Sequence, residues 1–205
     1  GEYDIIIGTQ MVAKGLDFEN VTLVGVLSAD QVLYSDDFRS NERGFDLLTQ
    51  VVGRSGRGTK RGRAIIQTYT PENPVIALAS HQDYVHFYQQ EILFRKAMLY
   101  PPFADIVVIG FVGEQESKVA KASQLFLEML SHLASKEYSE LPIRALRPTP
   151  AQVAKVSNKY RYKLMIKCKN NLTFRTMLSR LLVACGKEKA FAGVTVYADS
   201  NPDMI

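Results

Sequence analysis

The chain has 205 residues, of which 46% are hydrophobic and 22% are charged, a composition typical of globular proteins and not of disordered or fibrous ones. No stretch approaches the roughly 18 uninterrupted apolar residues of a membrane-spanning helix, which argues against an integral membrane protein. The formal charge of +4 is unevenly distributed: residues 101–205 contain 15 Lys and Arg against nine Asp and Glu, whereas residues 1–100 contain ten against twelve. The second half is therefore a candidate polyanion-binding region.

The first residue is Gly1 and not Met, and an apolar run follows at once, so we expect a piece of a longer protein. The two cysteines, Cys168 and Cys185, are not spaced as a metal-binding or disulfide pair, which predicts reduced thiols in a cytoplasmic protein. The three histidines also lack the spacing of metal ligands, and we expect no metal site in this chain.

Predicted strands alternate with a helix in the first half of the chain. Short β-branched runs at Tyr3–Ile7, Val21–Leu27 and Arg63–Tyr69 are typical of buried strands. Apolar residues recur at helical spacing from Asn41 to Gly56, and a further helix is expected over about Asp83–Leu99. This alternation indicates an α/β domain with a parallel sheet.

The prolines of Tyr100-Pro101-Pro102-Phe103 stop the preceding helix and predict a boundary between domains 1–100 and 101–205. Two amphipathic helices are expected in the second domain, around Val119–Leu133 and Phe174–Leu182. They lie among extended segments at Asp105–Val112, Ile143–Leu146, Val153–Val156, Tyr160–Lys169 and Val194–Ala198. The resulting order β-α-β-β-α-β is that of a ferredoxin-like α+β unit, in which both helices cover one face of the sheet and leave the other open.

The strand that ends at Lys169 alternates with period two. One side is apolar and includes Tyr160 and Tyr162, and the other is basic, interrupted only by Met165; the basic residues are Lys159, Arg161, Lys163, Lys167 and Lys169. We expect the apolar side to pack against the helices and the five cations to line the open face. This predicts contacts with nucleic-acid phosphates and little base preference; a solvated face without a partner is the alternative.

The segment Gln50-Val51-Val52-Gly53-Arg54-Ser55-Gly56-Arg57 is the first candidate site. On a helix, Gln50, Arg54 and Arg57 project from one face. Arginine binds phosphate oxygens bidentately and keeps its charge. The two arginines are therefore candidates for stabilising a γ-phosphoryl group during its transfer.

The second candidate site is the segment Gly8–Phe18, which follows the first predicted strand. Loops at the carboxyl ends of parallel strands form the ligand crevice of α/β sheets. Gly8 and Gly15 let backbone amides approach a phosphate closely. Hydrogen-bond donors come from Thr9, Gln10 and Lys14. Either segment taken alone could be a structural loop, but the two together are harder to explain as scaffold.

These two segments resemble motifs VI and V of superfamily 2 helicases, which lie in the second RecA-like lobe. Three further stretches narrow the resemblance to the PriA (primosomal protein N′) family: Asp37-Phe38-Arg39-Ser40-x-Glu42-Arg43, Gln67-Thr68-Tyr69-x-Pro71 and Glu91-x-x-x-Arg95-x-x-x-x-Tyr100-Pro101-Pro102-Phe103. The terminal Asp199-x-Asn201-Pro202 is similar to that family's ending. The resemblance spans the whole chain and is densest up to residue 103.

The resemblance implies the C-terminal part of a RecA-like lobe followed by the α+β domain. By position in the motifs, it assigns phosphate contacts to Arg54 and Arg57 and a place beside the γ-phosphate to Gln50. It further assigns nucleotide contacts to Gly15 and Asp17, and nucleic-acid backbone contacts to Thr9 and Gln10. The chain departs from the family at Leu16, where His is usual, and at Ser28, where Asp is common.

The resemblance also implies an ATP-dependent 3′-to-5′ DNA helicase that recognises stalled or branched replication forks and starts primosome assembly. ATP and Mg²⁺ would be shared with a first lobe outside this chain, and a zinc-binding insertion would also lie upstream. Because this sequence contains no G-x-x-x-x-G-K-[ST] phosphate loop, we expect no ATPase activity from the chain alone.

Single-stranded and forked DNA, single-strand-binding protein and other primosome proteins are the partners that the resemblance implies. Arg175 and Arg180 are candidate contacts for the acidic tail of single-strand-binding protein. Two alternatives remain open from the sequence: another superfamily 2 enzyme, such as a RecG-like translocase or an RNA helicase, and a non-enzymatic nucleic-acid-binding module.

Overall fold

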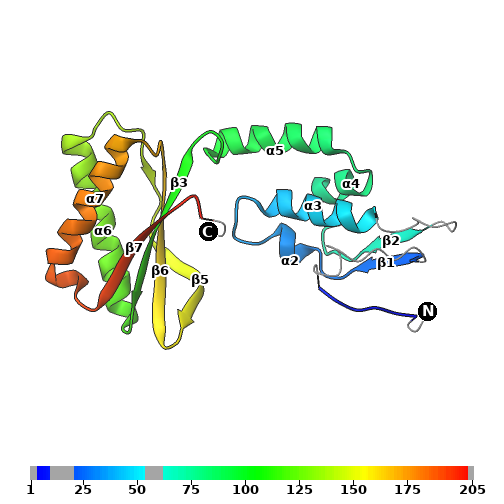
Figure 1. Cartoon of the computed structure of the whole chain (residues 1–205), viewed down its shortest axis with the longest axis horizontal. Coiled ribbons are helices and arrows are strands. Elements are labelled where there is room, and N and C mark those ends of the chain that lie inside the picture. The colour runs from blue at the N-terminus through cyan, green and yellow to red at the C-terminus, as the bar shows by residue number, and fades with distance from the viewer. Residues whose placement is uncertain (1–3, 10–20, 54–61, 203–205) are drawn as a thin grey trace. The chain divides into compact units, whose positions relative to one another are not determined.

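The computed structural model describes residues 4–9, 21–53 and 62–202. The chain divides into two compact units, Gly1–Phe94 and Arg95–Ile205, each of which is described by itself below (Figure 1). None of the helices in the described part of the chain combines the length and hydrophobicity that crossing a bilayer requires.

The first unit contains a two-stranded parallel sheet. β1 (Leu23–Val26) pairs with β2 (Arg63–Ile66), and the register places Leu23 opposite Arg63. Both strands fall inside predicted ones, and their parallel pairing confirms the expected type of sheet. The helices described in this unit are α2 (Asp30–Leu33), α3 (Ser40–Val52), α4 (Pro74–Ser80) and α5 (Tyr84–Met98), of which α5 continues into the second unit.

Aromatic and aliphatic side chains from these helices form the core of the first unit. The rings of Phe45 on α3 and Phe87 on α5 stack with their centroids 4.2 Å apart, and Leu48 is fully buried beside them. Val26 on β1 and Ile66 on β2 pack against this cluster. The predicted helix over 83–99 is thus confirmed as α5, although Phe87 and Glu91 are its only buried residues.

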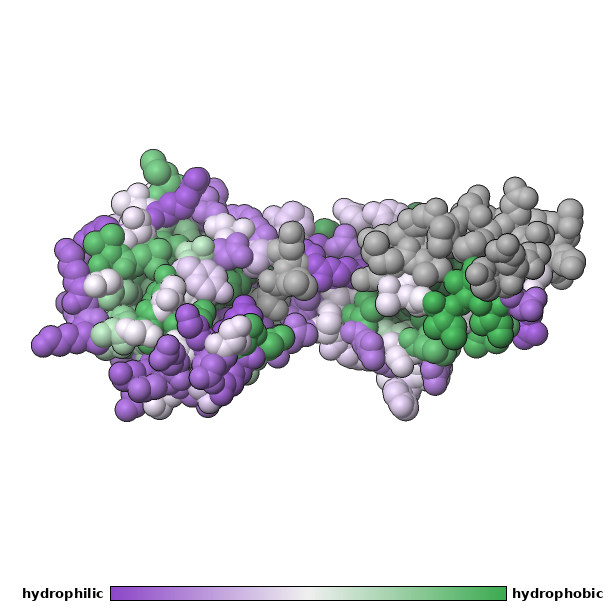
Figure 2. Space-filling view, turned by 60° about the horizontal axis from the view of Figure 1, so that its bottom comes forward, coloured by the Kyte–Doolittle hydropathy of each residue, from purple (hydrophilic) through white to green (hydrophobic). Residues whose placement is uncertain are grey.

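The expected strand at Tyr3–Ile7 is not found among the described residues. Residues 4–9 belong to no strand, and Ile5 and Ile7 are 80% and 91% exposed. β1 and β2 pair with each other and not with this segment, and an extended apolar segment becomes a strand only when its backbone groups find partners. Figure 2 shows hydrophobic residues gathered on the visible face of this unit.

The boundaries of α3 and α4 follow from local capping. α3 ends at Val52 with Gly53 as its C-cap, before the predicted end at Gly56. The predicted alignment of Gln50 with Arg54 and Arg57 on one helix face falls on residues outside the described ranges. α4, which the periodicity did not predict, starts where the Asn73 side chain accepts a hydrogen bond from the Val75 amide at 2.9 Å and Pro74 occupies the first turn, a common helix start.

The second unit is a five-stranded antiparallel sheet with two long helices. Its elements are β3 (Asp105–Gly113), α6 (Glu116–Glu137), β4 (Arg144–Ala145), β5 (Thr149–Val156), β6 (Lys159–Cys168), α7 (Leu172–Lys187), the short 3-10 helix η1 (Lys189–Phe191) and β7 (Val194–Ser200). The strand order is β4-β6-β3-β7, and β5 also pairs with β6. The two helices and the antiparallel sheet agree with the predicted β-α-β-β-α-β order, except that three strands, β4, β5 and β6, lie between the helices where that order has two.

Both helices pack against the same face of this sheet, as Figure 1 shows. Phe126 on α6 meets Phe111 on β3 edge to face at 5.5 Å, and Phe174 and Met177 on α7 are fully buried in the same cluster. Full burial of each such side chain contributes about 1.5–3 kcal/mol. This core fixes which side of every strand faces the helices.

A two-residue turn sets the register of the β5–β6 hairpin. Ser157 and Asn158 both have positive φ, 48° and 60°, the conformation of a type I′ turn. Val156 therefore pairs with Lys159. Lys159 and every second residue after it along β6 are turned away from the helices, which places the basic side chains on the open face.

Candidate nucleic-acid interface

The predicted alternation of β6 is confirmed by burial. Leu164, Ile166 and Cys168 are at most 3% exposed and belong to the core beneath the helices, and Tyr160 and Tyr162 pack against that core. The basic residues therefore occupy the other side of the strand.

The structure corrects the prediction for Lys167, which was expected to be one of five cations on the open face. Its residue is only 5% exposed, and its Nζ donates a hydrogen bond to the Met98 carbonyl oxygen at 2.6 Å. The same ammonium group lies 3.7 Å from the centre of the Tyr100 ring, within the range of a cation–π interaction. Lys167 is thus buried and held by its own chain, and it does not lie in an exposed row with the other cations.

The segment that leads into β3 covers this end of the sheet. Ile106, which is paired with Lys167 across the strands, is 1% exposed. Arg95 donates a hydrogen bond from Nη1 to the Pro101 carbonyl oxygen at 3.4 Å. Burial, together with the nearby positive charge of Arg144, lowers the pKa of Lys167, because both make the charged ammonium less favourable.

The other four predicted cations are more exposed to solvent than Lys167. Lys159 is exposed, and Arg161 and Lys163 are half-buried along β6. Lys169 is exposed just beyond the end of the strand. We define the basic strip as Lys159, Arg161 and Lys163, the cations of β6 other than the buried Lys167. A DNA contact of Lys169 stays a prediction.

A tyrosine on the open face was missed in the sequence. Tyr197 on β7 is directly opposite Gly110 on β3, and Gly110 is directly opposite Lys163 on β6. A Cβ added at Gly110 would come closer than 3.0 Å to the Tyr197 ring, so the ring lies over the glycine backbone. The signal was present in the alternation of Val194 and Val196 with Thr195 and Tyr197, and in a glycine inside a strand, which often marks a close approach.

In the first unit, the structure describes only two of the predicted site residues. Gln50 lies on α3 and is exposed, while the neighbouring Val51 is buried. Thr9 is exposed and outside any helix or strand. Gln10, Lys14, Gly15, Asp17, Arg54 and Arg57 lie outside the described residues, so their nucleotide and DNA contacts stay predictions.

Asp30 joins the carboxyl ends of β1 and β2. Its carboxylate accepts hydrogen bonds from the Thr68 hydroxyl at 2.9 Å, the Tyr69 amide at 3.1 Å and the Thr70 hydroxyl at 3.3 Å. Burial raises the pKa of Asp30, but the hydrogen bonds from Thr68, Tyr69 and Thr70 outweigh it and the pKa is lowered. The charged carboxylate therefore fastens the loop that follows β1 to the loop that follows β2.

A model of the family described as Primosomal protein N C-terminal domain matches residues 96–202. The chain belongs to this family.

Similar proteins extend the match over the first unit. The replication restart protein PriA of Bacillus subtilis is 41% identical over 205 residues, which cover 100% of this chain and 25% of that protein. The PriA protein of Synechocystis is 39% identical over 205 residues, and that of Treponema pallidum is 34% identical over 204 residues, covering 23% and 30% of those proteins. The chain thus spans about a quarter of the length of the curated relatives that it matches.

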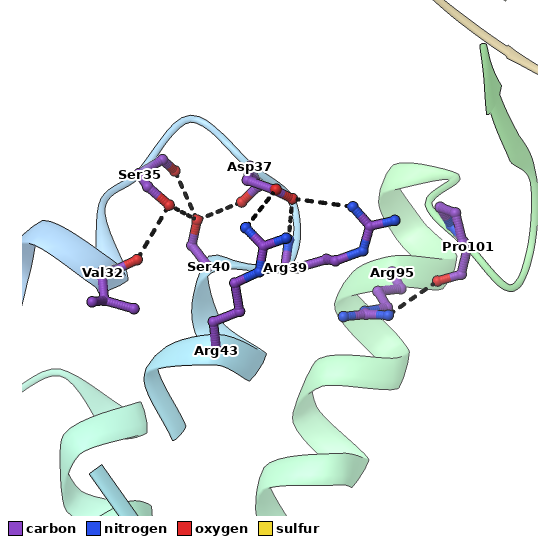
Figure 3. A network of polar contacts seen from close by, with 8 residues as sticks. All are labelled: Val32, Ser35, Asp37, Arg39, Ser40, Arg43, Arg95 and Pro101. Atoms are coloured by element: carbon purple, nitrogen blue, oxygen red, sulfur yellow. Dashed lines mark hydrogen bonds and ion pairs between the residues drawn. The ribbon is translucent and has the colours of Figure 1, made fainter. Parts of the chain in front are cut away.

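The segment around Asp37, which carries part of the resemblance to the primosomal protein N family, has a local structural role. Asp37 accepts hydrogen bonds from the Arg39 amide at 2.9 Å and from Arg43 Nη1 at 3.0 Å, and the Ser40 hydroxyl bonds to Ser35 (Figure 3). These contacts fasten the loop before α3 to its first turns. The side chain of Asp37 is only 6% exposed, so its charge is used within the fold.

The C-terminal motif of the primosomal protein N family fastens the sheet of the second unit. Asn201 exchanges hydrogen bonds with Ile106: its amide donates to the Ile106 carbonyl at 2.7 Å, and its Oδ1 accepts from the Ile106 amide at 2.9 Å. Its Nδ2 also donates to Asp105 at 3.2 Å. The end of β7 is thereby held to the start of β3.

The two arginines of α7 already have partners within the chain. Arg180 forms an ion pair with Glu137 at 2.7 Å and donates to the Tyr138 hydroxyl at 2.8 Å. Arg175 donates to the backbone carbonyls of Asn171 and Asn170 at 3.4 and 3.5 Å. A contact with an acidic tail stays a prediction, and at Arg180 it would have to compete with Glu137.

No group of three or more His, Cys, Asp or Glu residues within 4–9, 21–53 and 62–202 is arranged to hold a metal ion. Cys168 and Cys185 are buried free thiols. Burial raises the pKa of Cys168 to about 12 and that of Cys185 to about 11.

Proposed function

We propose that this chain is the C-terminal portion of a replication restart helicase, in which the second unit contributes DNA contacts through its open sheet face. The observation that carries the proposal is the basic strip Lys159, Arg161 and Lys163 on that face, in a chain whose relatives are named replication restart proteins. Cations in a row on a sheet attract the phosphates of a nucleic acid whatever its sequence.

In the longer protein, ATP hydrolysis would drive movement along one DNA strand in the 3′-to-5′ direction, at stalled or branched forks where primosome proteins assemble. Arg54 and Arg57 would stabilise charge on the γ-phosphoryl group, with Gln50 beside it. Gly15 and Asp17 would contact the nucleotide, and Thr9, Gln10 and Lys14 the DNA backbone. The match of the relatives across both units supports this larger role.

The DNA-binding part is tested on the 205-residue chain by measuring affinity for a single strand against salt. Three phosphate contacts predict that log K falls with log salt at a slope of about −2. Replacing the basic strip by alanine (Lys159→Ala, Arg161→Ala, Lys163→Ala) should weaken binding and flatten this slope.

The matched control removes the same charge from the helix side of the unit. Lys118, Lys121 and Lys136 are exposed on α6, and their replacement by alanine should leave most of the affinity in place. If the control and the basic-strip variant lose affinity equally, binding follows net charge and the open face has no special role.

A second candidate function, a nucleic-acid-binding module without enzymatic activity, applies to the chain in isolation. The basic strip favours it, since this strip needs no nucleotide to act. The expected result is DNA binding by the purified chain that does not change when ATP is added; ATP hydrolysis by the chain alone would contradict it.

A further inference from the structure

The open face of the second unit has an aromatic ring beside its cations. Tyr197, Gly110 and Lys163 stand side by side on β7, β3 and β6. The next row along the sheet is Thr195, Val112 and Arg161. Directly opposite residues in antiparallel strands have Cβ atoms about 4.5–5.5 Å apart, so the ring and both cations belong to one continuous surface.

Gly110 gives the Tyr197 ring its position. A side chain at residue 110 would collide with the ring, so the ring lies across the central strand and is supported from below by backbone. Tyr197 nevertheless remains 42% exposed. A tyrosine that is supported on one side and exposed on the other offers an apolar surface of fixed position beside positive charge.

An acidic residue limits where a polyanion can lie on this face. Asp199 is the next residue of β7 with the same orientation as Tyr197, and it is opposite Val108. At that end Lys167 is already bound to Met98. The rows of Tyr197 and Arg161 are therefore more favourable for a phosphate chain than the row of Asp199, because like charges repel.

We propose that this face binds single-stranded nucleic acid, with one base stacked on Tyr197 and the adjoining phosphates on Lys163 and Arg161. Bases of a single strand expose their faces, whereas in a duplex those faces are covered by neighbouring base pairs. Stacking on an aromatic ring accepts any base. The inference rests on the proposed function and adds to it: it selects unpaired over paired strands, which phosphate contacts alone do not.

The test compares Tyr197→Thr with Tyr197→Phe in the 205-residue chain, using an oligothymidylate of about 15 nucleotides as the probe. Threonine suits a strand but removes the ring, and phenylalanine keeps the ring without the hydroxyl. Tyr197→Thr should lower affinity about tenfold, which corresponds to the loss of one stacked base. Tyr197→Phe should bind as the original chain does.

A strand of the same length built from abasic residues separates stacking from a change in the fold. The original chain and Tyr197→Thr should bind this strand equally, because no base is present. An equal loss on both strands, or no loss on the oligothymidylate, would overturn the proposal.

Gly110→Ala provides a second variant that keeps the ring and all cations. The added methyl group displaces the ring from its support, so affinity for the oligothymidylate should fall while affinity for the abasic strand is retained. If either variant does not fold, photo-crosslinking of an iodouracil-containing strand to the unmodified chain decides: a crosslink at Tyr197 supports stacking, and crosslinks confined to other residues refute it.

Failure of this inference and failure of the proposed function give different results. If the basic-strip variant Lys159→Ala, Arg161→Ala, Lys163→Ala binds as the original chain does, the open face is not the DNA-binding surface and both fail. If that variant loses affinity while Tyr197→Thr does not, phosphate binding stands and stacking alone is refuted.

Discussion

The ammonium group of Lys167 donates a hydrogen bond to the carbonyl oxygen of Met98, 2.6 Å away. The two residues are 69 positions apart in the chain, and they connect the end of α5 to the end of β6. A lysine that the strand pattern assigned to a DNA-binding row is therefore part of the structural core of this unit.

Replacing Lys167 by methionine should lower the free energy of unfolding by about 1–2 kcal/mol, because the Met98 carbonyl loses its hydrogen-bond donor and the contact with Tyr100 is lost. The removal of a buried charge offsets part of this loss. Urea titration of the chain measures this change. DNA affinity should stay the same. Lys169→Met is the control, since Lys169 is exposed; a larger loss of stability there than at Lys167 would contradict the assignment.

The thiols of Cys168 and Cys185 should react with a thiol reagent such as Ellman's reagent only after unfolding. Burial raises their pKa to about 12 and about 11, and the reactive species is the thiolate. At pH 8 we expect slow labelling of the native chain and fast labelling in urea. Fast labelling of both residues in the native chain would show that they are accessible.

The same two cysteines predict a loss of stability in alkali. An unfolded thiol titrates near the ordinary value of 9.0, whereas the folded thiols hold their protons to about pH 11 or 12. The folded state therefore binds more protons above pH 9, and the stabilisation that is complete below pH 9 is lost as the pH rises. In a Cys168→Ala, Cys185→Ala variant the decline between pH 9 and 11 should be shallower, as measured by urea titration at each pH.

Asp30→Asn should reduce the acid sensitivity of the first unit. The pKa of Asp30 is lowered in the folded state, so its stabilisation is present above the ordinary value of 3.8 and is lost as the pH falls below it. Thermal unfolding of the first unit is measured at several pH values. The variant should have a lower unfolding midpoint at neutral pH, and its midpoint should fall less when the pH is made acidic. An unchanged midpoint at neutral pH would mean that the hydrogen bonds to Thr68, Tyr69 and Thr70 contribute little.

Arg57→Ala in the longer protein should lower kcat for ATP hydrolysis by about 10³-fold or more, the range found for arginines that stabilise a transferring phosphoryl group. DNA affinity should change little. Arg63, exposed at the start of β2, provides an arginine control expected to keep full activity. Unchanged ATP hydrolysis in Arg57→Ala would remove that residue from the proposed site.

Much of the second unit could be predicted from local patterns. The alternation of Leu164, Ile166 and Cys168 identified the buried side of β6, and the two positive-φ residues Ser157 and Asn158 lie between two segments that were predicted to be extended. These signals are reliable because side-chain direction alternates along any strand and repeats on any helix, whatever the rest of the chain does. In the first unit, the strand predicted at Tyr3–Ile7 is absent from its described residues, because they find no partner strand in the described part of the chain.

What the sequence by itself determined is the family, the two long helices of the second unit and the strands around them, and the side of β6 that faces the core. The tertiary structure decided which open-face residues remain available: Lys167 is removed by Met98 and Tyr100, and Tyr197 is added over Gly110. Both outcomes depend on contacts between segments that are far apart in the chain. Periodicity assigns a residue to a face, but only the folding of distant segments onto that face determines which of its residues are covered.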